Sequence, residues 1–282
     1  MLIVFKVINT VQIAFQMRIL QGIKKSKYYL LLSVLPIVFV VGGFKVGAHL
    51  LNWEVIPKDL SSFFPSILTG IIFILGFLLA GVVTDYKESE KIPNEIAASL
   101  YAIWQEADYL RIISNSKSAE SLMNKIKSFV PTLKQDYFLL GNDQLSKLLD
   151  SFSADIIEIG KEGAAPNYVL RMKAEVASLK KTINRITVIK NTDFVPSVFI
   201  CIKVISIVFL TVYCLLNVDP WWGGLILVSI FSFVIFAILF LIKDMEDPFE
   251  YDGSDDVKSG EISLMVLNSL QTEFEAKDLP LS

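Results

Sequence analysis

Two phenylalanines, Phe73 and Phe77, lie one helical turn apart in an apolar stretch that is long enough to cross a bilayer. Projected onto a helix, Phe63–Thr84 has one arc of aliphatic side chains and a second arc of small or weakly polar ones. Phe73 and Phe77 lie near the centre of the second arc, which also contains Thr69. Such an arc either packs closely on other helices or lines a narrow passage for ions. Helix spacing alone favours the packing interpretation.

An acidic segment near the C-terminus is a candidate metal-binding site. Lys243–Glu261 contains eight acidic residues and two lysines. Carboxylates gathered on a turn offer the oxygen ligands that Ca²⁺ prefers, although their spacing here does not match an EF-hand loop. The alternative, which we favour from the sequence, is a solvated acidic turn that caps a helix starting near Ser259.

The sequence argues against enzymes and nucleic-acid-binding proteins. The chain contains one histidine, so neither a histidine metal cluster nor a Ser-His-Asp triad is expected. It has neither a Walker loop nor a glycine-rich dinucleotide motif followed by a helix. The formal net charge of −3 makes nucleic acid an unexpected partner. We therefore expect a protein without enzymatic activity.

The composition instead predicts a multi-pass membrane protein. Of the 282 residues, 53% are hydrophobic, which exceeds the usual fraction in a soluble domain. Four apolar blocks approach or exceed the roughly 20 residues that span a bilayer. These blocks are Tyr28–Leu51, Phe63–Val83, Phe194–Leu216 and Trp221–Ile242. The connections within the first and the last pair are short, so each pair is expected to form an antiparallel hairpin.

Basic residues predict the orientation in the membrane. They cluster before the first block and follow the second and fourth blocks, whereas the two short loops contain only Lys58. The positive-inside rule therefore places both termini and the middle segment in the cytoplasm, in a cell inner membrane. Trp53, Trp221 and Trp222 then fall at the outer interface. Met1–Leu20 lacks a cleavage site and has helical apolar spacing, which predicts an amphipathic helix.

The middle segment changes character and predicts a helical cytoplasmic domain. Its apolar residues recur at helical spacing in four stripes, with breaks at residues 115–118, 141–142 and 160–167. The stripes begin at Ile92, Leu122, Leu145 and Val176. The expected fold class is an all-α membrane protein with four transmembrane helices in two hairpins. The expected regions are an amphipathic helix (1–27), hairpin 1 (28–83), the cytoplasmic domain (84–193), hairpin 2 (194–242) and the acidic turn with a C-terminal helix (243–282).

A few polar residues interrupt the apolar blocks. Lys203 is either a functional intramembrane charge or a side chain that reaches the inner interface. Lys45 and His49 lie one turn apart near the outer end of the first block. We interpret them as interfacial residues; a role in drawing anions to an outer vestibule is the less favoured alternative. Cys201 and Cys214 are expected to be buried apolar thiols that cannot bridge each other.

Three motifs, in order along the chain, resemble segments of the bestrophins. The first is FILGFLLAGVVTDYKESEKIP at Phe73–Pro93, the second is TDFVPSVF at Thr192–Phe199, and the third is IKDMEDPFEYDGSDD at Ile242–Asp256. Together they cover 44 residues, and the four-span layout fits the rest of the chain. On these motifs the sequence is identified as similar to a compact prokaryotic bestrophin.

The resemblance implies a homopentamer around a central pore. In the family the second span lines this pore, and its residues at helical spacing form a hydrophobic neck. Phe73 and Phe77 would be the neck residues, with Thr69 one turn outward. A narrow aromatic neck excludes water and ions, and a slightly wider one conducts. With the resemblance, the pore interpretation of the second arc becomes the favoured one. The family pore narrows again in the cytoplasm, where Pro166–Leu170 would approach it.

The resemblance also implies a candidate calcium site. In animal bestrophins a calcium clasp follows the fourth span. The matching positions here are the side chains of Asp252 and Asp255 and the carbonyls of Asp244 and Asp247. Uncharged residues interrupt the acidic run, which departs from the animal pattern, so the solvated turn stays the favoured interpretation.

The expected function is passive conduction of small monovalent ions, with anions such as chloride favoured by the resemblance. The sequence leaves a cation-selective channel open, because it does not fix how the phenylalanine rings present their positive edges or negative faces. It also leaves open a membrane-anchored scaffold whose helical domain binds a protein. A carrier is less favoured, because the chain has no paired half-sequences. The expected partners are the lipid bilayer, monovalent ions and further copies of the chain.

Overall fold

The computed structural model describes residues 29–134, 144–191, 196–246, 248–249 and 262–276. These residues are almost entirely helical and fall into two compact units. The first, which we call the membrane unit, contains the described residues up to 86 and from 196 to 246. The second, which we call the helical unit, contains residues 87–191 and the described residues from 248 onward.

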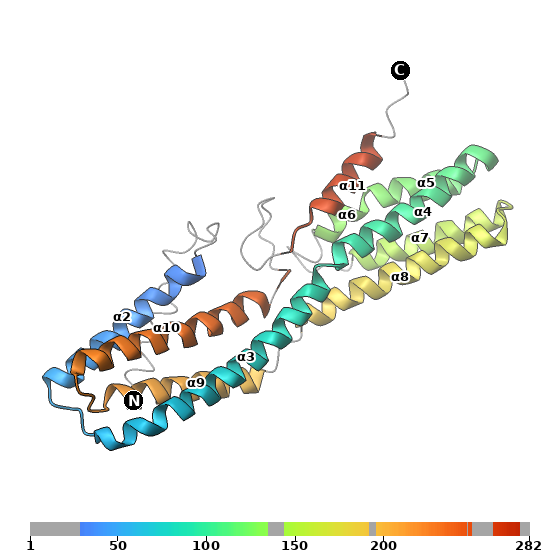
Figure 1. Cartoon of the computed structure of the whole chain (residues 1–282). Helices are drawn as coiled ribbons and strands as arrows, with labels where there is room; N and C mark the ends of the chain where they lie inside the picture. Colours follow the sequence, from blue (N-terminus) through green and yellow to red (C-terminus); the bar gives the residue numbers. More distant parts are fainter. Residues whose placement is uncertain (1–28, 135–143, 192–195, 247, 250–261, 277–282) are drawn as a thin grey trace. The chain divides into compact units, whose positions relative to one another are not determined.

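The membrane unit is a bundle of helices α2 (Tyr29–Leu50), α3 (Phe64–Ser89), α9 (Pro196–Cys214) and α10 (Trp221–Glu246). Among the described residues, four helical segments are long and apolar enough to cross a membrane, and each overlaps one of these four helices. Helix α10 lies alongside α2 and also contacts α9 (Figure 1). The prediction of an all-α protein with four transmembrane helices is confirmed.

Two short connections join the membrane helices into hairpins. The first contains a short 3₁₀ helix, η1 (Lys58–Phe63), which leads directly into α3. The two connections pair with each other, because the amide of Ile56 donates to the carbonyl of Leu215 (3.1 Å) and the amide of Asn217 donates to the carbonyl of Ile56 (2.9 Å). The end of the membrane unit where they meet is called the loop end below.

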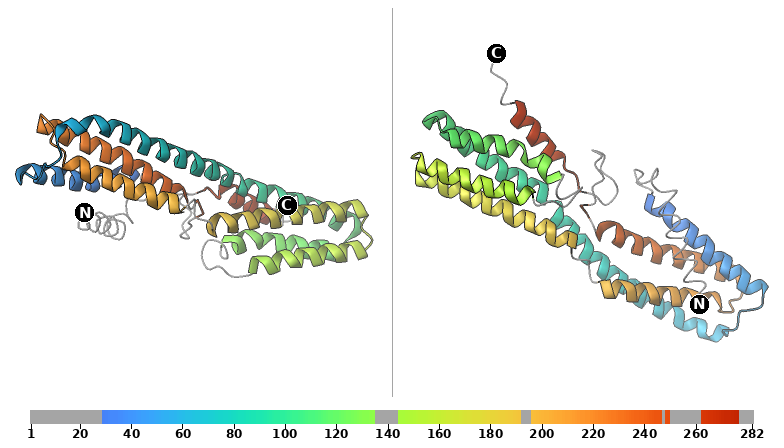
Figure 2. Two further views of the ribbon diagram at one scale, coloured as in Figure 1. Left: turned by 90° about the horizontal axis from the view of Figure 1, so that it is seen from below. Right: turned by 180° about the vertical axis from the view of Figure 1, so that it is seen from behind.

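The helical unit contains α4 (Ile92–Ser114), α5 (Lys117–Lys127), α6 (Phe129–Leu133), α7 (Gln144–Lys161), α8 (Pro166–Asn191) and α11 (Met265–Ala276). Helix α4 packs on α5, α8 and α11, while α7 packs on α5 and α8 (Figure 2). Nearly all described members of the four apolar stripes are buried in one continuous core, and Leu148 is partly buried. The helical spacing of the apolar residues therefore predicted the buried face of each main helix in this unit.

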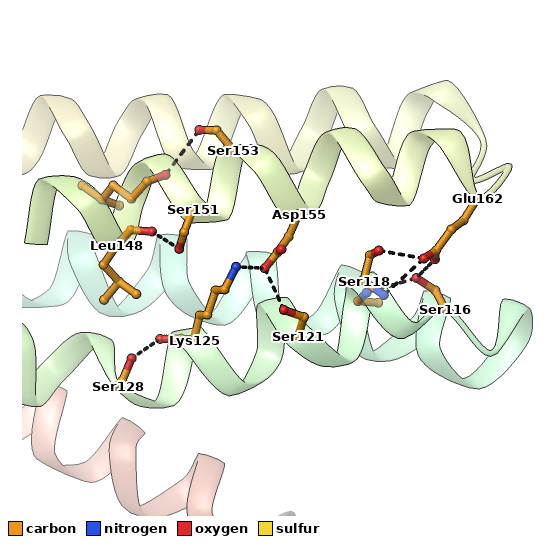
Figure 3. Close-up of polar contacts among 12 residues, drawn as sticks. Ser116, Ser118, Ser121, Lys125, Ser128, Leu148, Ser151, Ser153, Asp155 and Glu162 are labelled. Carbon is orange, nitrogen blue, oxygen red and sulfur yellow. Dashed lines mark hydrogen bonds and ion pairs between the residues drawn. The ribbon is translucent and has the colours of Figure 1, made fainter.

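A network of carboxylates and hydroxyls fixes the start of α5 (Figure 3). Asn115 ends α4 in the left-handed conformation, at φ 49°, and Ser116 then caps α5 by accepting a hydrogen bond from the amide of Ala119 (3.0 Å). The hydroxyl of Ser116 donates to the carboxylate of Glu162, and the hydroxyl of Ser118 donates to the same carboxylate at 2.6 Å. The carboxylate of Glu162 thus holds the α4–α5 turn against the end of α7.

The structure departs from the expected boundaries at two points. Helix α3 continues past Val83 to Ser89. The C-terminal helix begins at Met265 rather than near Ser259. The expected amphipathic helix at 1–27 lies outside the described residues.

Candidate functional site

Helix α3 exposes the arc that contains the two phenylalanines. The side chains of Phe73 and Phe77 are 73% and 72% exposed. Every other member of the weakly polar arc is also exposed apart from the half-buried Gly81. The buried side of α3 consists of Phe64, Ile71, Leu75, Leu78 and Val82. The fold of one chain therefore turns the arc away from its own core.

The exposed arc is apolar but carries acceptors for water or ions. The hydroxyls of Thr69 and Thr84 donate to the carbonyls of Pro65 and Ala80, each at 2.8 Å. These bonds occupy the hydroxyl protons and leave oxygen lone pairs toward the exposed side. No charged residue occurs between Phe64 and Thr84. Along this length the arc can therefore contact an ion only through weak dipoles and aromatic rings.

Two glycines on the same arc, Gly70 and Gly76, have open space where a side chain would be. A Cβ built at either position meets no atom within 4 Å apart from its own helix and neighbours. Packing inside this chain therefore does not explain why these residues are small. Small residues are useful where a second helix approaches closely or where a passage needs width.

The aliphatic arc of α3 divides into two parts, which the helix projection did not separate. Some of its members, such as Leu75, are in the core, whereas Ile67, Ile72 and Ile74 are 49%, 37% and 38% exposed. Helix α3 thus has a buried side, an exposed aliphatic side and the exposed aromatic arc. The exposed aliphatic side suits lipid or another copy of the chain.

Lys45 is not an interfacial residue, and that part of the sequence interpretation is wrong. Its side chain is 0% exposed. The ammonium donates to the carboxylate of Glu54 (2.5 Å) and to the carbonyls of Leu216 (2.7 Å) and Cys214 (3.3 Å). The charge is buried because one carboxylate and two helix-end carbonyls replace its water.

His49 shares the same carboxylate. Its Nδ1 lies 3.0 Å from the second oxygen of Glu54, and its ring stacks on Trp221 with centroids 5.0 Å apart and planes 10° apart. Burial alone would raise the pKa of Glu54, but the hydrogen bonds and charges of Lys45 and His49 outweigh it and lower that pKa. Sequence analysis missed Glu54, although a lysine inside an apolar span calls for a nearby acid.

The remaining polar candidates take different roles. Lys203 is half-buried within α9. Glu88, which the sequence places near the inner end of α3, forms an ion pair with Arg185 at 2.7 Å. Cys214 is buried as expected, whereas Cys201 is exposed.

The candidate calcium site lies mostly outside the described residues. Asp247, Asp252 and Asp255 belong to the part of the chain that the structure does not describe, and Asp244 lies near the end of α10. The described residues contain no group of three or more histidines, cysteines or acids that could hold a metal ion. The calcium clasp therefore stays a prediction.

Solved structures supply the comparison that decides the fold. No protein-family model matches the sequence, and no curated protein matches it. A point mutant of a bacterial bestrophin homologue from Klebsiella pneumoniae superposes with a TM-score of 0.70 at 12% identity, covering 87% of this chain and 98% of that chain. A second mutant of a bestrophin homologue from the same organism gives 0.67 at 13% identity, covering 88% and 97%. A structure described only as a membrane protein gives 0.68 at 12% identity, covering 89% and 97%.

The chain has a bestrophin fold. Near-complete coverage of both chains shows that the bestrophin-like architecture extends over the membrane unit and the helical unit alike. Together with the apolar helices, the bestrophin fold establishes a membrane protein. At this level of identity the likeness concerns the fold, so the function must be argued from the residues of this chain.

Proposed function

We propose that the chain is an ion channel that passes small monovalent ions through a central pore lined by α3. The observation that carries the proposal is the exposure of Phe73 and Phe77 on a membrane-spanning helix, at 73% and 72%. Five copies of α3 around one axis would stack these side chains into two aromatic rings, with Thr69 one turn away. Anions such as chloride are favoured, because family resemblance points to them.

The neck would work by wetting and drying. A narrow passage lined by phenylalanine offers no hydrogen bonds to replace an ion's hydration shell, so it empties of water and blocks conduction. A small outward movement of α3 admits water, and the ion then crosses with part of its shell. No bond is made or broken, and the chain supplies only a path of low polarity, in which the hydroxyl protons of Thr69 and Thr84 are already bonded to backbone carbonyls.

Ion flux from liposomes tests the proposal. Phe73→Ala and Phe77→Ala widen the neck, so each is expected to raise chloride flux several-fold over the unmodified protein. Phe39→Ala is the matched control, because Phe39 is 77% exposed on α2, a different membrane helix. The channel requires the control to leave flux unchanged. Absence of flux from all four proteins would favour the scaffold.

Selectivity is tested in the same liposomes. An anion pore passes chloride when sodium is replaced by a large organic cation, and it stops when chloride is replaced by a large organic anion. The reverse result would show a cation channel, in which the ring faces rather than their edges meet the ion.

Leu170 is the proposed second narrowing. Among residues 166–170, Leu170 is the large aliphatic one that is strongly exposed, at 71%, whereas Tyr168 and Val169 are half-buried. We place Leu170 on the pore wall in the helical unit. Leu170→Ala should therefore raise flux, and the neighbouring Val169→Ala should have a smaller effect.

The proposed location is an inner membrane with both termini and the helical unit in the cytoplasm, as the basic residues indicate. The two short connections then face the outside. A thiol reagent that cannot cross the membrane should label a cysteine placed at exposed Val55 in intact cells. It should not label one placed at exposed Ile112.

A further inference from the structure

The loop end of the membrane unit contains a built ionic cluster that the proposed conduction path does not use. Lys45 and His49 come from α2, and Glu54 comes from the connection that leads to α3. The carbonyls of Cys214 and Leu216 at the end of α9 complete the shell around the ammonium. The cluster therefore ties three segments of the membrane unit together.

Helix α10 closes the cluster from another side. A Cβ at Gly224 would lie 3.3 Å from Cε of Lys45 and 3.1 Å from Cβ of Val218, so only a glycine fits comfortably at this point. Trp221, three residues earlier, stacks flat on the His49 ring. The lysine stem is thus enclosed, whereas the His49 side chain keeps 39% of its surface exposed and can exchange protons with water.

His49 is the only histidine of the chain. Imidazoles ordinarily titrate between about pH 5 and 8, a range in which ordinary carboxylates and lysines keep their charge. The lowered pKa of Glu54 keeps its carboxylate ionised throughout this range, so the acceptor facing His49 stays constant.

We propose that Lys45, His49 and Glu54 form a proton-sensitive clasp, in which protonation of His49 tightens the hold on the connection leading to α3. A neutral imidazole can donate one hydrogen bond to Glu54. An imidazolium donates a charge-assisted bond at the same place and adds a cation–π interaction with the stacked indole of Trp221. Lys45 repels the new charge, but it binds the other carboxylate oxygen, so the closer attraction to Glu54 dominates.

Other titratable groups lie next to the cluster, but they ordinarily keep the same charge over the pH range in which imidazoles titrate. Tyr213 and Cys214 lie on α9 and are buried, and Asp219 lies exposed in the turn before α10. An ordinary phenol or thiol stays neutral and an ordinary carboxylate stays ionised through most of the histidine range. The proposed proton sensitivity of the cluster is therefore assigned to His49.

The clasp is joined to the start of α3 by a short stretch of the chain. Ile56, two residues after Glu54, is hydrogen-bonded to the α9–α10 connection, and η1 and Phe64 come next along the chain. Phe64 opens α3 and packs on Phe209 and Tyr213 of α9, with centroids 5.7 Å and 5.2 Å away. A firmer clasp opposes movement of this end of α3. In the proposed channel, acidification therefore lowers flux; this consequence rests on the proposed function, whereas the clasp itself does not.

Tryptophan fluorescence of the full chain tests the clasp without any reference to conduction. A protonated imidazole stacked on an indole quenches its emission. Emission should therefore fall as the pH is lowered from about 8 to about 5. This pH-dependent component should be absent from Trp221→Phe and from His49→Gln, which keeps hydrogen-bonding groups without the titration. Equal pH profiles for the unmodified protein and His49→Gln would overturn the clasp.

Flux at two pH values tests the consequence for α3. With the same pH on both sides of the liposome, flux should be about fivefold lower at about pH 5.5 than at about pH 7.5, an effect of the size that one cation–π contact supplies. His49→Gln should give equal flux at both values, and His49→Arg, which stays charged, should give low flux at both. A fivefold change that persists in His49→Gln overturns the gating role. No flux at any pH counts against the proposed channel, while fluorescence still decides the clasp.

Discussion

At the residue scale, Lys45 and Phe73 show which side-chain environments can be predicted from sequence. The exposure of Phe73 follows helical periodicity, a local property that separates its arc of α3 from the residues in the core. Lys45 was misplaced at the interface because the carbonyls that receive its charge belong to Cys214 and Leu216, far along the chain. Within the same hairpin, the clue was an acid in the next connection, which contains Glu54 and Asp59.

The buried ion pair leads to a prediction for Glu54→Gln. Removing the carboxylate leaves the Lys45 ammonium buried beside carbonyls alone, and breaking a buried pair in this way costs about 3–5 kcal/mol. We therefore expect a lower free energy of unfolding at neutral pH, measured by denaturation in mild detergent.

The control for this prediction removes both charges. Lys45→Met with Glu54→Gln should recover most of the lost stability, because an apolar replacement of the whole pair is often nearly neutral. If the double variant is no more stable than Glu54→Gln, the loss comes from the geometry of the connection and the ion-pair explanation is wrong.

At the scale of elements, the helices of the helical unit were largely predictable. Each has an apolar stripe that must be covered, and the buried residues follow those stripes closely. The α7–α8 break was also visible, because Gly163 adopts a φ of 97° that favours glycine. The start of α11 was predicted near Ser259 but lies at Met265. The acidic segment before it contains several residues that could cap a helix, and no regular spacing of apolar residues shows which of them does.

The proposed pore predicts which cysteines introduced into α3 will react with a thiol reagent. In a background without Cys201 and Cys214, cysteines at Thr69, Gly76 and Thr84 should react with a charged thiol reagent, because the proposed passage holds water. Gly76 has open space for the new side chain.

Cysteines at Ile67 and Ile74 provide the control for this labelling. Both positions are exposed in the single chain, at 49% and 38%, but they face the aliphatic side. They should stay unlabelled, since lipid or a neighbouring helix covers them. Equal labelling of both sides would mean that α3 has no preferred aqueous face, which would remove the basis for a pore along it.

The cap of α5 predicts an acid sensitivity of the helical unit. Hydrogen bonds from Ser116 and Ser118 lower the pKa of Glu162 from its usual 4.5. A lowered folded pKa means that the stabilisation is complete above the usual value and is lost as the pH falls from there through the folded value. Glu162→Gln should therefore flatten the dependence of stability on pH in that window, measured by thermal unfolding.

Ser116→Ala is the companion variant for the cap. It removes the N-cap of α5 and should cost about 1 kcal/mol at neutral pH. Ser153→Ala is a suitable control, because that hydroxyl bonds only the carbonyl one turn back in α7 (Figure 3). An equal loss in both variants would mean that the cap contributes nothing specific.

At the scale of the whole molecule, the architecture followed from local patterns and the assembly did not. Four apolar blocks joined by short connections imply two hairpins, and amphipathic stripes imply a helical unit. The number of copies depends on surfaces that contact other chains, and the spacing of apolar residues in one sequence does not give that number. Among the described residues, the exposed arc of α3 is the one on which the proposed assembly depends, because one helix cannot enclose the proposed passage.

The last prediction concerns that assembly. In mild detergent the protein should have the mass of five chains of 31.6 kDa, measured by light scattering with the detergent contribution removed. Five copies allow α3 to cover its aliphatic side with neighbours while Phe73 and Phe77 surround a common axis. The same sample should show a cooperative thermal transition, so that a smaller mass is not mistaken for unfolding. A folded monomer or dimer would leave Phe73 facing lipid and would favour the membrane-anchored scaffold, whereas a pentamer without flux would separate the assembly from conduction.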